Sequence, residues 1–314
     1  MKTGLGSLLN ESVERASLVR TARAWEYHRW VYLTALCGCL GVGCTQLDDA
    51  TDSCLVLGGP CETDQDGSDG PEVPPAWSCL NETPQAPPAN ASRPPITYVV
   101  PIVDFANPPT RPAALAITVC QFNDSDCENP VPAAINPVPN QPPAVVAITV
   151  PYGFDGYLKM TATDYVDTEY YLGGPMLGNL DGTTTVQGIP IPMLRQSVMD
   201  GMFTDLIQTR DITAGVLAIR SINCLGVPAD NVDVKMDDPV RGFGYTLINN
   251  QPVASDPPLP TDTRGVAGYA NVPPGGTSVR GFVGDSVIGR TGFRVRENQL
   301  TVGEVRSDAG LYGR

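Results

Sequence analysis

The stretch GVLAIRSINCLGVPADNVDVKMD (residues 215–237) decides the expected fold, because two runs rich in β-branched and aliphatic residues flank a turn containing Gly, Pro and Asn. Similar segments follow at short intervals: GFGYTLI (242–248), GVAGYANV (265–272), TSVRGFVG (277–284) and GFRVRENQLTVGEVR (292–306). Pro-Pro, Gly-Gly, Asn-Asn and Asp-Pro pairs separate them, and such pairs favour tight turns. The pattern predicts a β-sandwich over residues 214–306.

The first half of the chain predicts a second, smaller set of strands. Over residues 96–175 the segments ALAITVC, AVVAITVP, YLKMTA and EYYL alternate with turns rich in Pro and Asn. A connector follows at 176–213, and within it MLRQSVMDGMFTDLIQT (193–209) repeats apolar residues at the three-to-four-residue spacing of an amphipathic helix. The expected fold class is mainly β, with two small immunoglobulin-like or transthyretin-like sandwiches joined by one helix-containing connector.

Part of the second sandwich resembles a known family. Gly226-Val-Pro-Ala-Asp-Asn-Val-Asp-Val fits a "G-x-P-x-x-x-V-x-V" run, and Thr261-Asp262, Gly265, Tyr269 and Val272-Pro-Pro-Gly275 fit the later "T-D-x-x-G" and "P-x-G" turns. This pattern resembles the carboxypeptidase regulatory-like domain, which is related to the collagen-adhesin B-type repeat. The resemblance implies a non-catalytic accessory domain with a carbohydrate-binding-like fold. It also implies a tight turn at Gly265 and a core position for Tyr269.

The N-terminal part predicts export. WVYLTALCGCLGVGC (residues 30–44) is an uncharged apolar run behind several arginines. It is too short for a membrane-spanning helix, which needs roughly twenty residues, but it suits the core of a signal peptide. We therefore expect a signal peptide with a long charged leader over residues 1–43, and a low-complexity tether rich in acidic residues, Pro and Gly over residues 44–95.

The end of the apolar run resembles the lipobox of bacterial lipoproteins. Cys44 is the preferred lipidation site and Cys39 the alternative, because small residues precede both. The expected partner is then a membrane, reached through the lipid, and Thr45 favours the outer membrane by the same resemblance. Ordinary cleavage, which would release a secreted or periplasmic protein, stays open.

Composition narrows the function classes. The chain carries 20 basic and 34 acidic residues, for a formal net charge of −14. Nucleic acid is therefore an unsuitable partner, since it is bound through cationic patches. The only histidine, His28, lies in the predicted leader, and no Cys-x-x-Cys spacing occurs. We expect no catalytic residues, no metal and no cofactor.

Six cysteines follow the candidate lipidation sites. An even number of cysteines in an exported chain indicates disulfides, although six allow fifteen connectivities. Equal separations favour Cys54 with Cys61 and Cys120 with Cys127, which leaves Cys79 with Cys224.

Three functions remain open for the exported part. The first is a non-catalytic spacer or binding module at the cell surface, with a glycan or a surface protein as partner. The second is sugar or peptide recognition by a tyrosine cluster, although core packing is the more common role of such residues. The third is a glycoside hydrolase that uses a carboxylate pair. The tyrosines in question are Tyr157, Tyr165, Tyr170 and Tyr171, and the nearby acids are Asp155, Asp164, Asp167 and Glu169.

Overall fold

The computed structural model describes residues 75–81, 93–108, 110–139, 144–178, 183–238 and 242–306, all within a compact unit that spans Asp69–Arg314. The predicted signal peptide lies outside these residues, as do Cys39, Cys44, Cys54 and Cys61. Among the described residues, no helix combines the length and the apolar character needed to cross a bilayer.

The first half of the described chain is built from short strands. A 3-10 helix, η1 (Pro75–Asn81), comes first, and then β1 (Ile96–Asp104), β2 (Ala116–Gln121), β3 (Ala134–Pro137), β4 (Val145–Val150), β5 (Gly156–Thr161), β6 (Thr168–Tyr171), β7 (Thr185–Gln187) and β8 (Ile191–Met193). Within the described ranges β3, β4, β1 and β7 form a sheet in that order, and β8 pairs with β1 as its fifth strand. Residues 75–81 belonged to the predicted tether, but Trp77 is buried.

The second half contains one α-helix and the remaining strands. They are α3 (Gln196–Asp205), β9 (Gly215–Ile222), β10 (Asp233–Met236), β11 (Phe243–Ile248), β12 (Gln251–Ala254), β13 (Val266–Val272), β14 (Gly275–Val283), β15 (Ser286–Val295) and β16 (Leu300–Arg306). In the described part of the chain β10, β14 and β15 form a three-stranded sheet. The predicted mainly β fold is therefore confirmed, and the described residues contain one α-helix.

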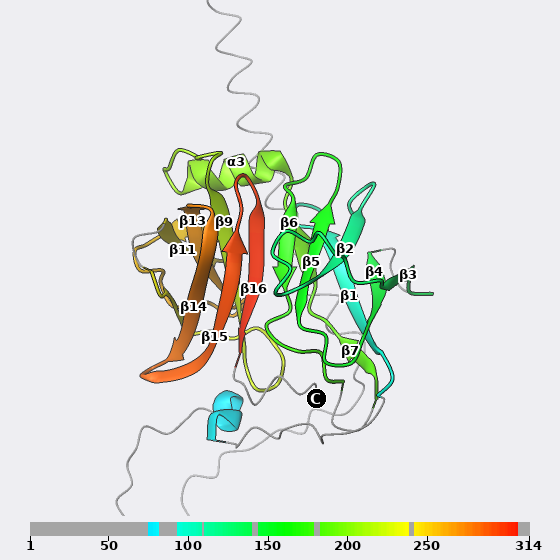
Figure 1. Cartoon of the computed structure of the whole chain (residues 1–314). Helices are drawn as coiled ribbons and strands as arrows, with labels where there is room; N and C mark the ends of the chain where they lie inside the picture. Colours follow the sequence, from blue (N-terminus) through cyan, green and yellow to red (C-terminus); the bar gives the residue numbers. More distant parts are fainter. Residues whose placement is uncertain are drawn as a thin grey trace, which may run out of the picture. The chain divides into compact units, whose positions relative to one another are not determined.

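One eight-stranded sheet joins the two halves. Its order is β12-β11-β13-β9-β16-β6-β5-β2, so strands from both predicted sandwiches belong to it (Figure 1). The junction is β16, which pairs in parallel with β6 of the first half and with β9 of the second. The sequence predicted two sandwiches separated by a connector, whereas the hydrogen-bonded sheet runs through that boundary.

The central strands of this sheet are buried on both faces. Leu158 and Tyr170 face one core, shared with β1 and β4, while their neighbours Tyr157 and Tyr171 face a second core, shared with β14 and β15. Successive side chains of a strand point to opposite faces, so a strand that is covered on both faces has a nearly continuous run of apolar residues in its sequence. This accounts for the unbroken burial of β6 and most of β16.

The helix is shorter than the sequence pattern predicted. The expected range was 193–209, but α3 spans Gln196–Asp205, and Met193 is the last residue of β8. Arg195, with extended backbone angles, precedes the first helical turn. After the helix, Ile207 takes a positive φ of 56° and is 90% exposed, so it lies outside the predicted apolar stripe.

The turn expected from the family resemblance is present. Gly265 has φ +65°, and its amide donates to the carbonyl of Asp262 over 2.8 Å. A side chain at Gly265 would also collide with Ala229, since a Cβ would lie 2.8 Å from that backbone nitrogen. Tyr269 is buried, as predicted, and its hydroxyl donates to the carbonyl of Val234 over 3.1 Å.

Candidate functional site

The tyrosines that the sequence offered as a binding cluster lie inside the molecule. Their exposed fractions are at most 9%, for Tyr157, Tyr165, Tyr170 and Tyr171. Three of them lie on β5 and β6, inner strands whose two faces are both covered. They therefore form no exposed aromatic row, and core packing is their role in the structure.

The acidic residues that the sequence offered for a glycoside hydrolase do not form a catalytic pair. Glu169 is fully buried and ion-paired with Arg296, while Asp155 and Asp164 are exposed. Asp164 occupies a turn with φ +66°. In the described residues, no three His, Cys, Asp or Glu side chains gather as metal ligands would.

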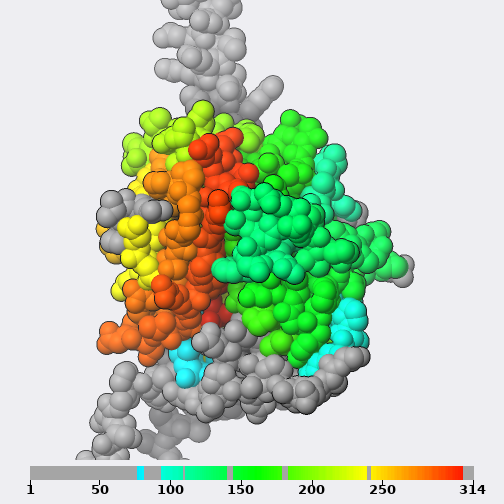
Figure 2. All heavy atoms as spheres, in the orientation of Figure 1, coloured from blue at the N-terminus to red at the C-terminus, as the bar shows by residue number. Residues whose placement is uncertain are grey.

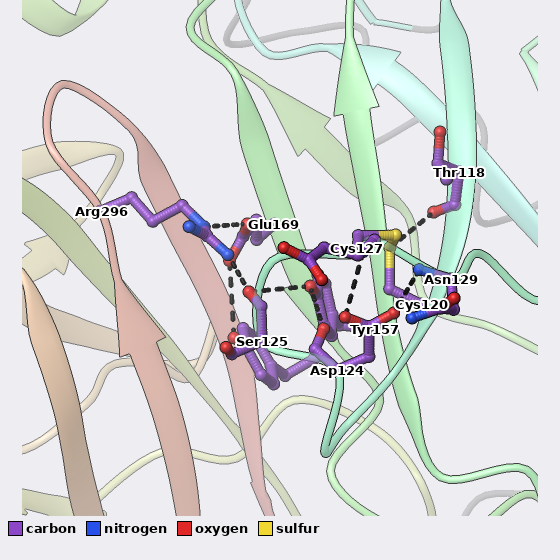
Figure 3. The surroundings of a disulfide bond; sticks show 11 residues. Thr118, Cys120, Asp124, Ser125, Cys127, Asn129, Tyr157, Glu169 and Arg296 are labelled. Atoms are coloured by element: carbon purple, nitrogen blue, oxygen red, sulfur yellow. Dashed lines mark hydrogen bonds and ion pairs between the residues drawn. A yellow bond between two sulfur atoms is a disulfide. The ribbon is translucent and has the colours of Figure 1, made fainter.

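A disulfide closes the loop that follows β2. Cys120 is bonded to Cys127, and Cys79 to Cys224, which are two of the pairings considered from the sequence. The carboxylate of Asp124, inside this loop, accepts hydrogen bonds from the amides of Glu128 and Asn129, which directly follow the loop, at 3.0 and 2.7 Å. The hydroxyl of Tyr157 donates from below to the carbonyl of Asp124 over 2.9 Å. We call residues 120–127 the disulfide loop, and these contacts fix its shape (Figure 3).

Arg296 ties the disulfide loop to the second half of the chain. It lies in the turn between β15 and β16, and its guanidinium lies 2.9 Å from the carboxylate of Asp126. It also reaches Glu169 at 2.6 Å (Figure 3). A further N–H donates to the carbonyl of Ser125. Burial raises the pKa of Glu169, because the loss of water outweighs the attraction of Arg296. The hydrogen bond from Arg296 lowers the pKa of exposed Asp126.

The fixed loop presents one aromatic side chain to solvent. Phe122 is 48% exposed, although its ring also packs edge-on against buried Tyr171 with the centroids 6.1 Å apart. In Figure 2 the disulfide loop, in blue-green, lies at the front of the molecule beside the orange and red C-terminal strands. Several large apolar side chains of the described residues are exposed, and Phe122 is the one aromatic ring among them. We therefore take its surroundings as the candidate binding surface.

A shallow surface hollow of about 510 Å³, widely open to solvent, lies beside Phe122. Its lining consists of two aromatic residues, two carboxylates, two hydroxyl residues and two glycines: Phe122, Phe293, Asp237, Asp238, Thr277, Ser278, Gly276 and Gly292. We call the two glycines, which carry no side chains, its floor. A Cβ at Gly276 would meet nothing within 4 Å, so the backbone there is open to a ligand. An aromatic face beside polar groups and bare backbone suits a flat, polar molecule.

Asp237 organises the polar side of the hollow. Its carboxylate accepts from Arg280 at 2.5 Å, from Arg290 at 2.7 Å and from the hydroxyl of Ser278 at 2.5 Å. These contacts hold the pKa of Asp237 below its usual range, with the hydrogen bond from Ser278 as the main cause. The carboxylate therefore stays ionised and keeps both arginines in place.

Besides Glu169, the eight-stranded sheet carries a second buried carboxylate, Glu304, on its opposite face. Glu304 accepts a hydrogen bond from the hydroxyl of Tyr170 and lies 3.3 Å from Arg306. Tyr98 of β1 joins this group, and burial followed by the charge of Glu304 raises its pKa. These side chains pack the five-stranded sheet against the eight-stranded one, and nothing in the composition of the segments pointed to them.

Comparisons with known proteins give a coarse picture. No family model matches the chain, and no curated protein matches it. Among solved structures it is similar to the Bacillus anthracis TIE protein (15% identity, TM-score 0.24, 68% of this chain and 34% of that one) and a streptococcal ancillary pilin (13%, 0.21, 67% and 68%). A shaft pilin, SpaA, from Lactobacillus rhamnosus GG has 10% identity and a TM-score of 0.18, over 66% and 96% of the two chains. The chain thus spans about a third of the TIE protein, and at such TM-scores no function is transferred.

No pattern of residue types or spacings pointed directly to the hollow. Phe122 and Phe293 lie far apart in the chain, and the glycines of the floor come from two strands that meet only in the folded sheet. The equal spacing of the cysteines was the one clue, because it pointed to a closed loop around Phe122.

Proposed function

We propose that this protein is a non-catalytic module of the bacterial cell envelope, held at the outer membrane by a lipid on Cys44, and that it binds a glycan at the hollow beside Phe122. The observation that carries the binding proposal is the half-exposed ring of Phe122 on a loop closed by a disulfide. Aromatic rings bind the apolar faces of sugar rings, while carboxylate and hydroxyl groups bind their hydroxyls. Asp237 and Ser278 supply such groups next to the ring.

The fold supports a mechanical role as well. β16 joins both halves into one hydrogen-bonded sheet, and Cys79–Cys224 links η1, which lies within the predicted tether, to the second half. Such a unit suits a rigid spacer that presents a fixed surface away from the membrane.

The binding test compares one substitution with a matched control. Phe122→Ala removes the exposed ring, while Leu225→Ala removes another apolar side chain, 65% exposed, from a different loop. On an array of bacterial and plant polysaccharides we expect binding by the natural protein and by Leu225→Ala, and a loss of about tenfold or more in Phe122→Ala. Equal binding by all three proteins, with unchanged thermal unfolding, would remove Phe122 from the proposal.

The anchoring test is independent of the ligand. Intact mass of the membrane-fraction protein, with and without Cys44→Ser, should show an acylated chain that starts at Cys44 and disappears in the variant. An unmodified secreted chain would leave a soluble binding protein in place of a lipoprotein.

A further inference from the structure

Three basic residues lie directly beside one another on the outer face of the three-stranded sheet. Lys235 of β10 is paired with Arg280 of β14, and Arg280 is paired with Arg290 of β15. Like charges in directly opposite positions destabilise a sheet. The arrangement is unexpected in a chain with a net charge of −14.

Few local groups offset these three charges. Asp237 is shared by Arg280 and Arg290, and the ring of Phe282 lies under Lys235 and Arg280, at 4.8 and 5.7 Å. Asp238, the next residue in the chain, adds a second carboxylate to the lining of the hollow. Arg280 and Arg290 still expose 45% and 64% of their side chains. Their guanidinium groups are therefore held in position and remain open to a ligand.

The cationic row borders the hollow described above. Asp237 and Ser278 line the hollow and are also the groups that Arg290 contacts, at 2.7 Å and 3.1 Å. Arg294 is paired in the sheet with Gly276 of the floor and is 44% exposed, and Asp126 lies 3.7 Å from it. A ligand whose ring lies on Phe122 would thus meet positive charge beyond Asp237.

We propose that the glycan bound at the hollow is anionic, with its sugar ring against Phe122 and a carboxylate or sulfate group bound by Arg280 and Arg290. Guanidinium groups bind such oxyanions through paired N–H donors, which a neutral sugar cannot use. Because Asp237 already neutralises part of the row, the site selects a sugar with isolated negative charges over a dense polyanion. This inference rests on the proposed function, since it specifies the ligand of the same hollow.

The test uses three polymers with one backbone: dextran, carboxymethyl dextran and dextran sulfate of low substitution. With the whole exported chain on a biosensor surface, we expect the charged polymers to bind about tenfold or more tightly than dextran in low salt. This preference should fall steeply as salt is raised. The carboxymethyl and sulfate arms show which oxyanion is preferred.

Variants separate this inference from the proposed function. The double change Arg280→Gln with Arg290→Gln should abolish the preference for charged polymers and leave weak dextran binding, whereas Phe122→Ala should weaken all three. Arg264→Gln, which removes an exposed arginine elsewhere, is the matched control and should change nothing. If the double variant unfolds, Arg280→Lys with Arg290→Lys keeps the charges and should retain part of the preference.

Three results would overturn the proposals: the first two refute the anionic ligand, and the third refutes the proposed function. Equal affinity for dextran and for its charged derivatives in the natural protein would refute the anionic ligand while leaving glycan binding intact. The site would also be refuted if the control Arg264→Gln lost the preference for charged polymers as fully as the double variant does. If Phe122→Ala binds all three polymers as tightly as the natural protein does, the proposed function is refuted instead.

Discussion

Two buried carboxylates lie at the junction of the halves, one on each face of the eight-stranded sheet. Glu169 of β6 faces the three-stranded sheet and the disulfide loop, and Glu304 of β16 faces the five-stranded sheet. Glu169 is bound by Arg296, whose side chain is 20% exposed and has further partners in Asp126 and Ser125. Glu304 is bound by Tyr170 and Arg306 and lies among the groups that surround Tyr98.

The difference between the two faces indicates where the loss of a hydrogen-bond or ion-pair partner costs the folded protein less stability. Arg296 and Arg306 are similarly exposed, at 20% and 25%, so the arginines do not separate the two faces. On the Glu169 face, however, Arg296 also binds Asp126 of the surface loop, which is 50% exposed, so water can replace that partner. On the Glu304 face the tyrosine hydroxyls are fully buried, and water is a poor substitute. Loss of a partner should therefore cost more on the Glu304 face.

The largest effect is expected from Glu304→Ala. Removing this carboxylate leaves Tyr170 without its acceptor and Arg306 without its partner, and breaking a buried charged pair costs about 3–5 kcal/mol. Chemical denaturation measures the change in the free energy of unfolding. The isosteric Glu304→Gln, which keeps an acceptor for Tyr170, should cost clearly less. A loss below about 1 kcal/mol for the alanine variant would show that this face is open to solvent after all.

A smaller effect is expected from opening the disulfide loop. Replacing both Cys120 and Cys127 by Ser removes a seven-residue closure and should lower the free energy of unfolding by about 2 kcal/mol. Hydrogen exchange should rise around Phe122 and Glu169 but not around Tyr98. Uniformly faster exchange on both faces would show that the loop supports the whole sheet and not one side of it.

The pH dependence should separate the two faces further. The pKa of Glu169 is raised in the folded protein by burial, so the folded state binds its proton more tightly than the unfolded state does. Its contribution to stability is therefore fully present below the pKa of an unfolded glutamate and is lost as the pH rises through the raised value. Glu169→Gln should remove this fall in the free energy of unfolding between about pH 4 and neutrality. An unchanged pH profile would show that Glu169 remains ionised throughout.

The smallest effect is expected from Arg296→Lys. Lysine keeps the positive charge but cannot reach Glu169, Asp126 and Ser125 together, so we expect a loss of about 1 kcal/mol. Thermal unfolding measures it, with Arg264→Lys as the control. A loss as large as that of Glu304→Ala would show that the two faces are equally sensitive to the loss of a partner.

Much of the local structure followed from local patterns. The strand segments, the turn at Gly265, the buried Tyr269 and the presence of one helix were all predicted from residue type and spacing. The helix ends were misjudged because Met193, although apolar and in phase, is hydrogen-bonded into β8 beside β1. The tyrosine cluster was ambiguous because buried and exposed aromatic strands share one composition.

The sequence by itself determined a mainly β chain with an excess of acidic residues, and it also predicts export and paired cysteines. Apolar runs and turn residues are readable in this way because they act over a few neighbouring positions. Only the tertiary structure decided that β16 lies between β6 and β9, that Glu169 and Glu304 face different cores, and that Phe122 meets the glycines of β14 and β15 in one hollow. These arrangements join residues far apart in the chain, such as Leu300 with Val216 and Leu300 with Thr168. Strand pairing and burial select them among many alternatives that have the same local pattern.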